Sequence, residues 1–560
     1  MSVMEPINTP NSDTKPASGA ADRSRLVLAA LAIIALVQVH FSLTRTINWD
    51  EFFFYGQIVD FTQGEALRPL QTLHVQLFQW IPAIASDGVE GILIGRMVML
   101  VCALATAAAV AAIAGRFART DYALTAGLVW LAAGFTMQHG WSFRTDPLAT
   151  VFVAGGLAVL ARAKLNAAWI AVGGLLIGIA GMVTLKAILF LPAFAGLAWL
   201  RWSEEQFSLT RAIRIAAIPV VALIAFAAIY LVHATLLDNG SASTGAAYVG
   251  GVSQDMLFAG WPIYLHFAVK AAILSIPALA AIVVTASMLP TIQRDRAIAL
   301  TGLMLPIAAL VIYRNTLPYF YPMMLVPVIA ASVIGIAAIA ERYSLRLLVF
   351  YTAISGCVVW IVDGHSRIDE QRGIQHAADQ IFNEPVGFFD FSDMLPAHRK
   401  ANGFLTRWGI ESTYEGGTGY FRERLENEAV PLLLTAEPEQ NPTLLAIMNE
   451  LPQQVRFRAE EREVLRATYR QFWGPFWLAG REVGAGESAR YEVLVPGPYT
   501  VTAGEVELDG AVYDAGTVVV LKRGFVELRN TSTAPTGIIW GDKLTPPDGP
   551  PPERPYWRGF

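Results

Sequence analysis

Long apolar runs recur along the first two thirds of the chain and are separated by short polar loops. A run of about 18 or more apolar residues is long enough to cross the hydrocarbon core of a bilayer as a helix. We therefore predict a polytopic α-helical membrane protein with about eleven transmembrane helices. The predicted spans are residues 26–43, 92–114, 122–138, 147–162, 167–184, 187–200, 215–236, 266–289, 297–312, 321–340 and 346–362.

The pattern changes after about residue 362, where the chain becomes charged and rich in Gly and Pro. Strand-like runs at 386–391 and 430–435, separated by helix-like stretches, predict an α/β region. From about 485 to 540, apolar and polar residues alternate between turn residues, which predicts a β-rich module. A soluble C-terminal part is therefore expected after the membrane part.

Basic residues in the loops predict the orientation of the spans, because cytoplasmic loops are enriched in Lys and Arg. With a cytoplasmic N-terminus, every even-numbered span ends beside a basic cluster, and an odd number of spans exports the C-terminal part. These clusters are Arg116 and Arg119, Arg162 and Lys164, Arg201, Arg211 and Arg214, Arg294 and Arg296, and Arg342 and Arg346. The simplest interpretation is a bacterial inner membrane with the C-terminal part in the periplasm.

The expected domains follow from these patterns. They are a disordered cytoplasmic tail at 1–22, a transmembrane domain at 23–362 with an external loop at 44–91, a periplasmic α/β region at 363–484, and a periplasmic β-rich module with a Pro-rich tail at 485–560.

Composition narrows the class further. The chain is 54% hydrophobic and only 16% charged, whereas soluble domains carry about 25% charged residues. A net charge of -5 does not suggest a nucleic-acid partner. Both cysteines, Cys102 and Cys357, fall inside apolar runs, so neither a disulfide framework nor a zinc site is expected.

Two acidic sites lie on the external side in this topology. Asp50 and Glu51 open the loop after the first span, and Asp146 precedes a proline at the start of a later span. Carboxylates near a bilayer edge are costly and are often kept for pairing or function, so Asp50 is a candidate general base. The alternative is structural, because Asp favours helix N-termini and the aromatic residues 52–55 suit a membrane interface.

Three cations, Arg68, Lys186 and Arg314, are predicted to lie on the same side of the membrane. Guanidinium and ammonium donors beside tyrosines suit a phosphate group. The alternative is that these long side chains reach the lipid headgroups without binding a substrate.

Six short motifs in a fixed order resemble those of the GT-C class of integral-membrane glycosyltransferases, particularly the lipid A aminoarabinose transferase and protein O-mannosyltransferase group. The motifs are WDEFFFYG, RPLQTLHVQLFQW, IGRMVML, FRTDPLATVF, GMVTLKAILFLP and RNTLPYFYPMMLVP, and they cover about residues 25–345. Two departures affect the fifth motif: Leu185 separates Thr184 from Lys186, and Ala187 replaces a glycine. In two other motifs arginine, at Arg68 and Arg314, replaces lysine.

The resemblance implies transfer of a sugar from a polyprenyl-phosphate donor to a cell-envelope lipid, glycan or protein. Asp50 would be the base of an inverting displacement, with Glu51 shaping the site and Asp146 orienting the donor or binding a cation. Mg²⁺ or Mn²⁺ at Asp50 and Asp146 are the candidate metals. The substrate-binding candidates, given by the same motifs, are Tyr55, Arg68, His74, Arg96, Arg144, Lys186, Arg314, Tyr319 and Tyr321.

Three alternatives remain open at this point. A transporter or flippase of an envelope precursor would place ionisable groups near the bilayer midplane, whereas here they gather at span ends. A non-catalytic scaffold with an exported binding domain is a second alternative. The third is an enzyme that transfers a whole glycan from a polyprenyl diphosphate.

Overall fold

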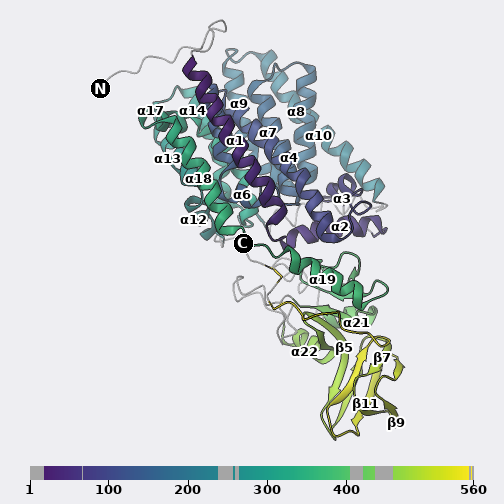
Figure 1. The fold of residues 1–560 in the computed structure, drawn as a ribbon. Helices are drawn as coiled ribbons and strands as arrows, with labels where there is room; N and C mark the ends of the chain where they lie inside the picture. The colour runs from purple at the N-terminus through teal and green to yellow at the C-terminus, as the bar shows by residue number, and fades with distance from the viewer. Residues whose placement is uncertain are drawn as a thin grey trace.

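A computed structural model describes residues 18–65, 67, 69–237, 256–258, 264–403, 420–435, 458–553 and 556–557. A bundle of helices carries a domain of strands and short helices at one end, with α19 (Ile368–Ile381) between the two (Figure 1). We call the end of the bundle that contacts this domain the domain-side end. The fold class predicted from the sequence is confirmed.

Seven helices in the described part are long and apolar enough to cross a membrane, or up to nine if two bent pairs each count as one span. The seven are α1 (Ser18–Thr44), α4 (Gly88–Ala114), α7 (Thr145–Arg162), η1 with α9 (Leu185–Ser203), α10 (Leu209–Leu236), α14 to α15 (Arg294–Ile312) and α18 (Leu345–Asp363). The bent pairs are α12 (His266–Ile273) with α13 (Ile276–Met288), and η4–α16 (Pro318–Ala331) with α17 (Val333–Arg342).

The other two of the eleven predicted spans are helical but do not cross as single long helices. The segment at 167–184 forms the shorter α8 (Ala167–Val183). The segment at 122–138 divides into α5 (Thr120–Leu131) and α6 (Gly134–His139). Hydropathy did not separate α5 from α6 because the residues at the break, Leu131 to Gly134, are themselves apolar or Gly.

The break between α5 and α6 meets the break between α12 and α13. The Gly134 N–H donates to the Ser275 hydroxyl at 2.7 Å, so a backbone group freed by one break is satisfied by the other. A side chain at Gly134 would overlap Leu274, so glycine permits this approach. Non-helical backbone is tolerated within a membrane bundle where it is buried and hydrogen-bonded in this way.

Small residues bring other helices close together. Gly174 and Gly178 of α8 lie against the α10 backbone at Ile218 and Ala222, and Gly196 of α9 lies against Gly302 of α14. Lipid tails are as apolar as Leu, so close backbone packing of this kind stabilises helix pairs in membranes.

The C-terminal domain contains two sheets. The first has the order β10-β7-β12-β5-β3-β1-β2, with β4 also paired to β5, and the second has the order β6-β11-β8-β9. β1 is parallel to β2 and β3, and the other pairs are antiparallel. The helices are α19, α21 (Tyr420–Asn427) and α22 (Ala459–Thr468). The strands are β1 (Gly387–Phe389), β2 (Arg399–Lys400), β3 (Leu432–Leu434), β4 (Tyr469–Trp473), β5 (Phe476–Val483), β6 (Ser488–Val493), β7 (Gly497–Val501), β8 (Glu505–Leu508), β9 (Ala511–Asp514), β10 (Val518–Leu521), β11 (Gly524–Asn530) and β12 (Thr536–Trp540).

Two glutamines on α19 fasten the domain to the bundle. The Gln371 amide donates to the Ile47 carbonyl at 2.8 Å and accepts from the Ile47 N–H at 3.1 Å. One turn later, the Gln375 amide accepts from the Val89 N–H at 3.2 Å and donates to the Met394 carbonyl at 2.9 Å. Each glutamine side chain therefore hydrogen-bonds backbone groups that have no partner in a helix or strand ladder.

Helix α2 (Trp49–Thr62), with α3 (Leu73–Phe78), lies at the domain-side end and contacts the domain along one face. The Phe52 ring meets Trp557 edge to face at 5.3 Å, and Trp49 meets Phe391 at 5.5 Å. The neighbouring Tyr556 hydroxyl donates to the Thr435 carbonyl at 2.7 Å. Residues from the far end of the chain thus cover the helix that carries Asp50.

The same face of α2 buries a carboxylate group of the domain. A side chain at Gly56 would overlap the Asp393 carboxylate, and Asp60 lies one turn further along α2. Burial raises the pKa of Asp393 well above its ordinary value, with the charges of Asp60 and Asp390 adding to the effect and that of Lys400 opposing it. Burial, then the charge of Glu65, raises the pKa of Asp60 from 3.8 to about 6, again against Lys400.

We expect Asp60→Asn to stabilise the protein above about pH 6 and to have little effect near pH 4. The carboxyl binds its proton more tightly in the folded chain, since its pKa rises from 3.8 to about 6. The protonated Asp60 carboxyl therefore contributes fully to the stability of the fold below its unfolded pKa, and this contribution is lost as the pH rises through about 6. Thermal unfolding of the full chain in detergent between pH 4 and 8 measures this difference. The exposed Asp548→Asn is the control, and an Asp60→Asn shift that is constant with pH would contradict the prediction.

Candidate functional site

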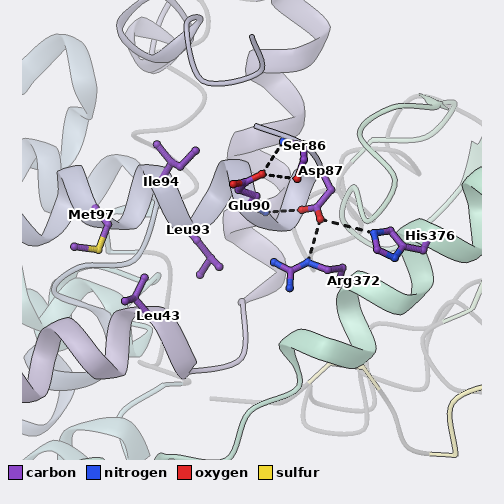
Figure 2. Close-up of a pocket in the computed structure, with 9 residues that line it drawn as sticks. All are labelled: Leu43, Ser86, Asp87, Glu90, Leu93, Ile94, Met97, Arg372 and His376. Carbon is purple, nitrogen blue, oxygen red and sulfur yellow. Dashed lines mark hydrogen bonds and ion pairs between the residues drawn. The ribbon is translucent and has the colours of Figure 1, made fainter. Parts of the chain in front are cut away.

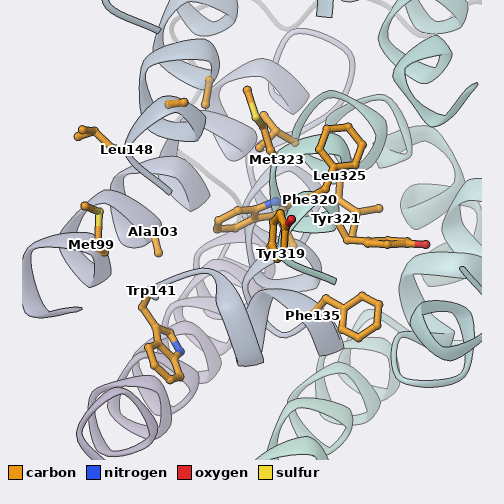
Figure 3. Close-up of a cluster of buried hydrophobic side chains, with 14 of the residues drawn as sticks. Met99, Ala103, Phe135, Trp141, Leu148, Tyr319, Phe320, Tyr321, Met323 and Leu325 are labelled. Atoms are coloured by element: carbon orange, nitrogen blue, oxygen red, sulfur yellow. The ribbon is translucent and has the colours of Figure 1, made fainter. Parts of the chain in front are cut away.

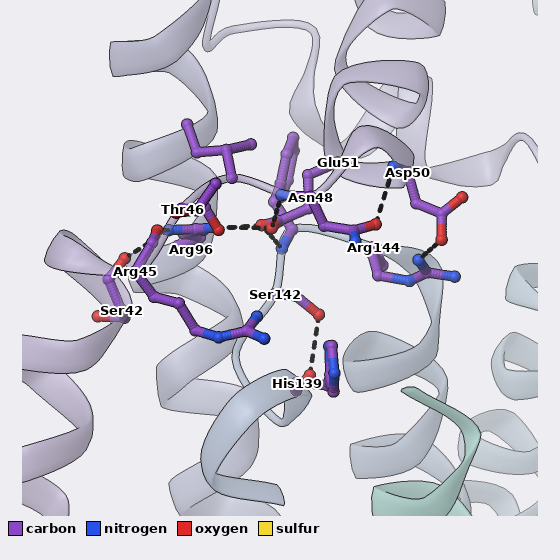
Figure 4. A network of polar contacts seen from close by, with 12 residues as sticks. Ser42, Arg45, Thr46, Asn48, Asp50, Glu51, Arg96, His139, Ser142 and Arg144 are labelled. Carbon is purple, nitrogen blue, oxygen red and sulfur yellow. Dashed lines mark hydrogen bonds and ion pairs between the residues drawn. The ribbon is translucent and has the colours of Figure 1, made fainter. Parts of the chain in front are cut away.

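The N-terminus of α2 is built by Asn48, not by Asp50. The Asn48 side-chain oxygen accepts from the Asp50 N–H at 3.0 Å, and the Asn48 N–H donates to Glu51 Oε1 at 3.1 Å. This reciprocal arrangement is a capping box. The structural alternative that made Asp50 the cap is therefore not what the structure shows, and the Asp50 carboxylate points elsewhere (Figure 4).

Glu51 is fully buried and forms a bidentate ion pair with Arg96 of α4. Arg96 Nε and Nη2 each donate to one Glu51 oxygen at 2.7 Å. The backbone N–H of Phe143 donates to Glu51 Oε2 at 2.8 Å. Glu51 therefore joins α2, α4 and the segment before α7.

Arg96 uses all five of its N–H donors inside the protein. Beyond its two bonds to Glu51, Nη1 donates to the carbonyls of Ser42 at 3.0 Å and Arg45 at 2.8 Å, and Nη2 donates to Thr46 at 3.2 Å. The guanidinium carbon lies 5.0 Å from the centre of the Trp141 ring. With no donor left over, Arg96 supports the site and does not face a substrate.

Four charged residues form a chain beside this ion pair. Arg144 Nη1 pairs with Asp50 Oδ2, and Arg144 Nε lies 3.4 Å from Asp146 Oδ2. Lys186 Nζ then lies 2.5 Å from Asp146 Oδ1. The side chains of Asp50 and Lys186 are 10% and 15% exposed, and those of Arg144 and Asp146 are 4% exposed or less. This ionic chain is therefore buried except at its two ends.

Local structure explains how Lys186 reaches Asp146. Thr184 is the N-cap of the 3-10 helix η1 (Leu185–Phe190), and its hydroxyl accepts from the Lys186 N–H at 3.4 Å. The extra Leu185 is accommodated in this turn. The departure from the family motif therefore still brings Lys186 to the second acidic site.

Aromatic rings flank Arg144 on two sides. Its guanidinium carbon lies 3.5 Å from the centre of the Tyr319 ring and 5.7 Å from that of Phe54. Lys186 Nζ lies 5.0 Å from the same Tyr319 ring. A cation over an aromatic face is stabilised, most strongly when water is excluded.

Tyr321 is buried but extends away from Tyr319 (Figure 3). Its ring meets Phe135 at 4.9 Å, and its hydroxyl has no hydrogen-bond partner among the described residues. The structure thus brings together Asp50, Arg144, Asp146, Lys186 and Tyr319, and leaves Tyr321 in the neighbouring core.

The other predicted residues lie around this cluster. Tyr55 packs on Gly91 of α4, and burial, then the charges of Asp87 and Glu90, raises its pKa to about 12. His74 meets Phe54 edge to face at 5.2 Å, and burial lowers its pKa to about 4. His74 is therefore neutral at physiological pH and reaches Arg144 only through Phe54.

Two predicted cations remain, Arg314 and Arg68. Arg314 is half-buried, and its backbone N–H donates to the Met256 carbonyl at 2.9 Å. Arg68 lies outside the described residues.

Some supporting residues were missed in the sequence. Arg45 Nε pairs with Asp363 at 2.7 Å, and Arg45 Nη1 donates to the Gln138 carbonyl at 3.2 Å. The sequence shows Arg45 only as a cation outside the cytoplasmic clusters, and its partner is 318 positions away. The contributions of Phe54 and of the Phe143 N–H likewise have no sequence signal beyond proximity to Asp50 and Arg144.

The donor set does not fit the predicted Mg²⁺ or Mn²⁺ ion. Asp50 is paired with Arg144, and Asp146 with both Arg144 and Lys186, so the Arg144 guanidinium lies where a metal bridging the two acids would bind. Among the described residues, no group of three or more His, Cys, Asp or Glu side chains could hold a metal ion. No chemical step is therefore assigned to a metal.

The cluster combines a carboxylate that can act as a base with N–H donors that can bind an anion. Asp50 Oδ2 pairs with Arg144, and no described residue donates a hydrogen bond to Asp50 Oδ1. Lys186 likewise uses one of its three N–H groups on Asp146. The arrangement can accept a proton at Asp50 and hold an anion near Lys186.

Comparison with known proteins identifies the fold. No protein-family model and no curated protein matches the chain. The crystal structure of ArnT from Cupriavidus metallidurans bound to undecaprenyl phosphate is similar, with a TM-score of 0.54 at 14% identity over 75% of this chain and 93% of that chain. Its apo state gives 0.52 at 14% identity over 78% and 96%.

The apo oligosaccharyltransferase of Archaeoglobus fulgidus is similar over a longer part of this chain. Its TM-score is 0.52 at 10% identity, covering 92% of this chain and 94% of that chain. The chain therefore has the fold of GT-C membrane glycosyltransferases, as its motifs predicted.

Breaking the buried ion pair is expected to destabilise the protein strongly. Arg96→Met leaves the Glu51 carboxylate buried without its partner, which costs about 3–5 kcal/mol of unfolding free energy. Thermal unfolding of the full chain in detergent measures this loss. The control is Arg399→Met, which removes a 56% exposed arginine from its pair with Glu428 and should cost below about 1 kcal/mol. Equal losses in the two variants would contradict the structural role of Arg96.

Proposed function

We propose that this GT-C chain is a glycosyltransferase that moves a sugar from a polyprenyl-phosphate donor to a cell-envelope acceptor. The observation that carries the proposal is the alternating chain Asp50, Arg144, Asp146 and Lys186 at the domain-side end of the bundle. The distribution of basic residues among the loops supports assigning this end to the external face of the membrane, which we take to be the periplasmic face of a bacterial inner membrane. ArnT of Cupriavidus metallidurans, with the same fold, binds undecaprenyl phosphate in its crystal structure.

Asp50 is the general base in this proposal. Its carboxylate takes the proton of the acceptor hydroxyl or amine while the acceptor O or N forms a bond to the anomeric carbon. The bond from that carbon to the phosphate oxygen breaks in the same step, and its electron pair leaves with the polyprenyl phosphate. The displacement inverts the configuration of the sugar.

Cations near Asp146 stabilise the leaving phosphate. Negative charge on the phosphate increases in the transition state, so donors that are already in position there lower the barrier. Lys186 and Arg144 are held by Asp146 and by the Tyr319 ring. Arg68 and Arg314 are assigned to the same donor region on their motifs alone, and Glu51 with Arg96 fixes the start of α2.

A second candidate is transfer of a whole glycan from a polyprenyl diphosphate. It is favoured by the fold match to the archaeal oligosaccharyltransferase, which extends over 92% of this chain and so includes the C-terminal domain. Assays with monophosphate and diphosphate donors separate the two candidates. A transporter would instead give substrate flux in proteoliposomes without sugar transfer.

Asp50→Asn is expected to lower sugar transfer by about 10²–10⁴-fold, the usual contribution of a general base. The amide nearly matches the carboxylate in shape, so the chain should still fold and insert. Transfer is measured with the purified full chain and a set of polyprenyl-phosphate sugars, using extracted envelope lipids and glycans as acceptors. Asp514→Asn on an exposed strand is the matched control. Full activity of Asp50→Asn would overturn the assignment of the base.

Lys186→Met is expected to reduce kcat/KM for the donor by about 10²-fold, as when one donor to a developing oxyanion is removed. Lys186→Arg should recover part of this loss because it retains the charge. Varying donor at saturating acceptor, and then acceptor at saturating donor, shows which substrate is affected. A loss confined to the acceptor would remove Lys186 from the phosphate region.

A further inference from the structure

A cavity lies on the outer surface of the domain-side end, between the bundle and α19. Its volume is about 530 Å³, which is within the range of small-molecule sites. It is bordered by the end of α1, the first turns of α4 and one face of α19 (Figure 2). Residues from the membrane part and from the C-terminal part therefore line the same cavity.

The two sides of this cavity differ in chemistry. Leu43, Leu93 and Met97 belong to helices long enough to span a membrane, and Leu43 and Met97 are 43% and 36% exposed. The opposite side carries charged or polar groups, among them Glu90, Arg372 and His376. An apolar side next to a polar rim is the pattern expected where lipid tails meet lipid headgroups at the surface of a bilayer.

This cavity is separate from the Asp50 cluster. Arg96 donates to the Ser42 carbonyl on the inner side of the contact between α1 and α4. The next residue of each helix, Met97 and Leu43, lines the outer cavity. The two sites therefore lie on different faces of one helix pair.

Arg372 is oriented with unused donors towards the cavity. Its Nε donates to Asp87 Oδ2 at 3.0 Å, and His376 Nε2 lies 4.0 Å from the same oxygen. The two terminal nitrogens of Arg372 make no hydrogen bond to the described residues, and Figure 2 shows them on the side of Leu93 and Leu43. A guanidinium in this position can bind two phosphate oxygens at once.

Glu90 supplies the opposite charge. Its Oε2 accepts from the Ser86 N–H at 2.7 Å and from the Ser86 hydroxyl, which fixes the carboxylate at the rim and leaves Oε1 available. Asp87 already neutralises Arg372, so Glu90 makes the rim favour a ligand that has an ammonium as well as a phosphate. A headgroup with phosphate alone would meet two carboxylates and one guanidinium.

We infer that this cavity binds a membrane phospholipid whose headgroup carries a phosphate and a primary ammonium. The phosphate contacts the terminal nitrogens of Arg372, the ammonium contacts Glu90, and an acyl chain lies along Leu43, Leu93 and Met97. The bound lipid joins α19 to α1 and α4. This inference does not depend on the proposed transferase activity.

The test is native mass spectrometry of the full chain in detergent micelles doped with phosphatidylethanolamine, phosphatidylcholine or phosphatidylglycerol. We expect phosphatidylethanolamine to be retained several-fold over the other two lipids. Arg372→Ala should lower its retention on the order of tenfold, as expected when a charged hydrogen-bond donor is lost. Met97→Trp, which narrows the apolar wall, should also lower it. The matched control is Arg367→Ala, at the N-cap of the same helix but paired with Glu370 outside the cavity.

Three results would overturn the inference. One is equal retention of phosphatidylethanolamine and phosphatidylcholine, since a quaternary ammonium cannot donate to Glu90. Another is unchanged retention in Arg372→Ala. The third is binding of millimolar inorganic phosphate at Arg372 with no lipid retained, which would make the cavity a site for free anions. None of these measurements uses transferase activity, so failure of the proposed function leaves the test intact.

Discussion

The domain-side end of the bundle depends on a buried guanidinium whose five N–H groups all have acceptors. An arginine and a glutamate removed from water each cost several kcal/mol, and only complete hydrogen bonding offsets this. Arg96 and Glu51 meet that condition by drawing in the last turn of α1, the start of α2 and the backbone before α7. Three parts of the chain that are far apart in sequence, residues 42–51, Arg96 and Phe143, are thereby held in one geometry. Asp50 and Arg144 are positioned because they are the sequence neighbours of Glu51 and Phe143.

The adjoining ionic chain buries four charged residues almost completely, and its formal net charge is zero. Acid and base alternate from Asp50 to Lys186, so each interior residue has an opposite charge on both sides. Such a chain is preorganised, which limits the ordering that a substrate must induce. An anionic ligand nevertheless has to compete with Asp50 and Asp146 for the same cations, so selectivity rests on how well its oxygens replace those carboxylates.

The sequence was sufficient for what depends on hydropathy. All eleven apolar segments are helical, and Asp50, Asp146 and Lys186, which were predicted to share one end, belong to one ionic chain in which Arg144 joins Asp50 to Asp146. The sequence was insufficient where adjacent residues point towards different partners. Consecutive positions on a helix point about 100° apart, so Asp50 and Glu51 face different partners although they are adjacent. The break after Leu131 also left no signal, because Ser275 satisfies the freed N–H from another segment.

The contact between Phe52 and Trp557 has a consequence for the order of assembly. Phe52 emerges from the ribosome about 500 residues before Trp557, which at about 5–20 residues per second is a delay of roughly 25–100 s. During that time the bundle can insert, but the helix that carries Asp50 lacks its aromatic cover. Completion of the site therefore belongs to a late step of biosynthesis, after the C-terminal part has been made and has folded back onto the membrane part.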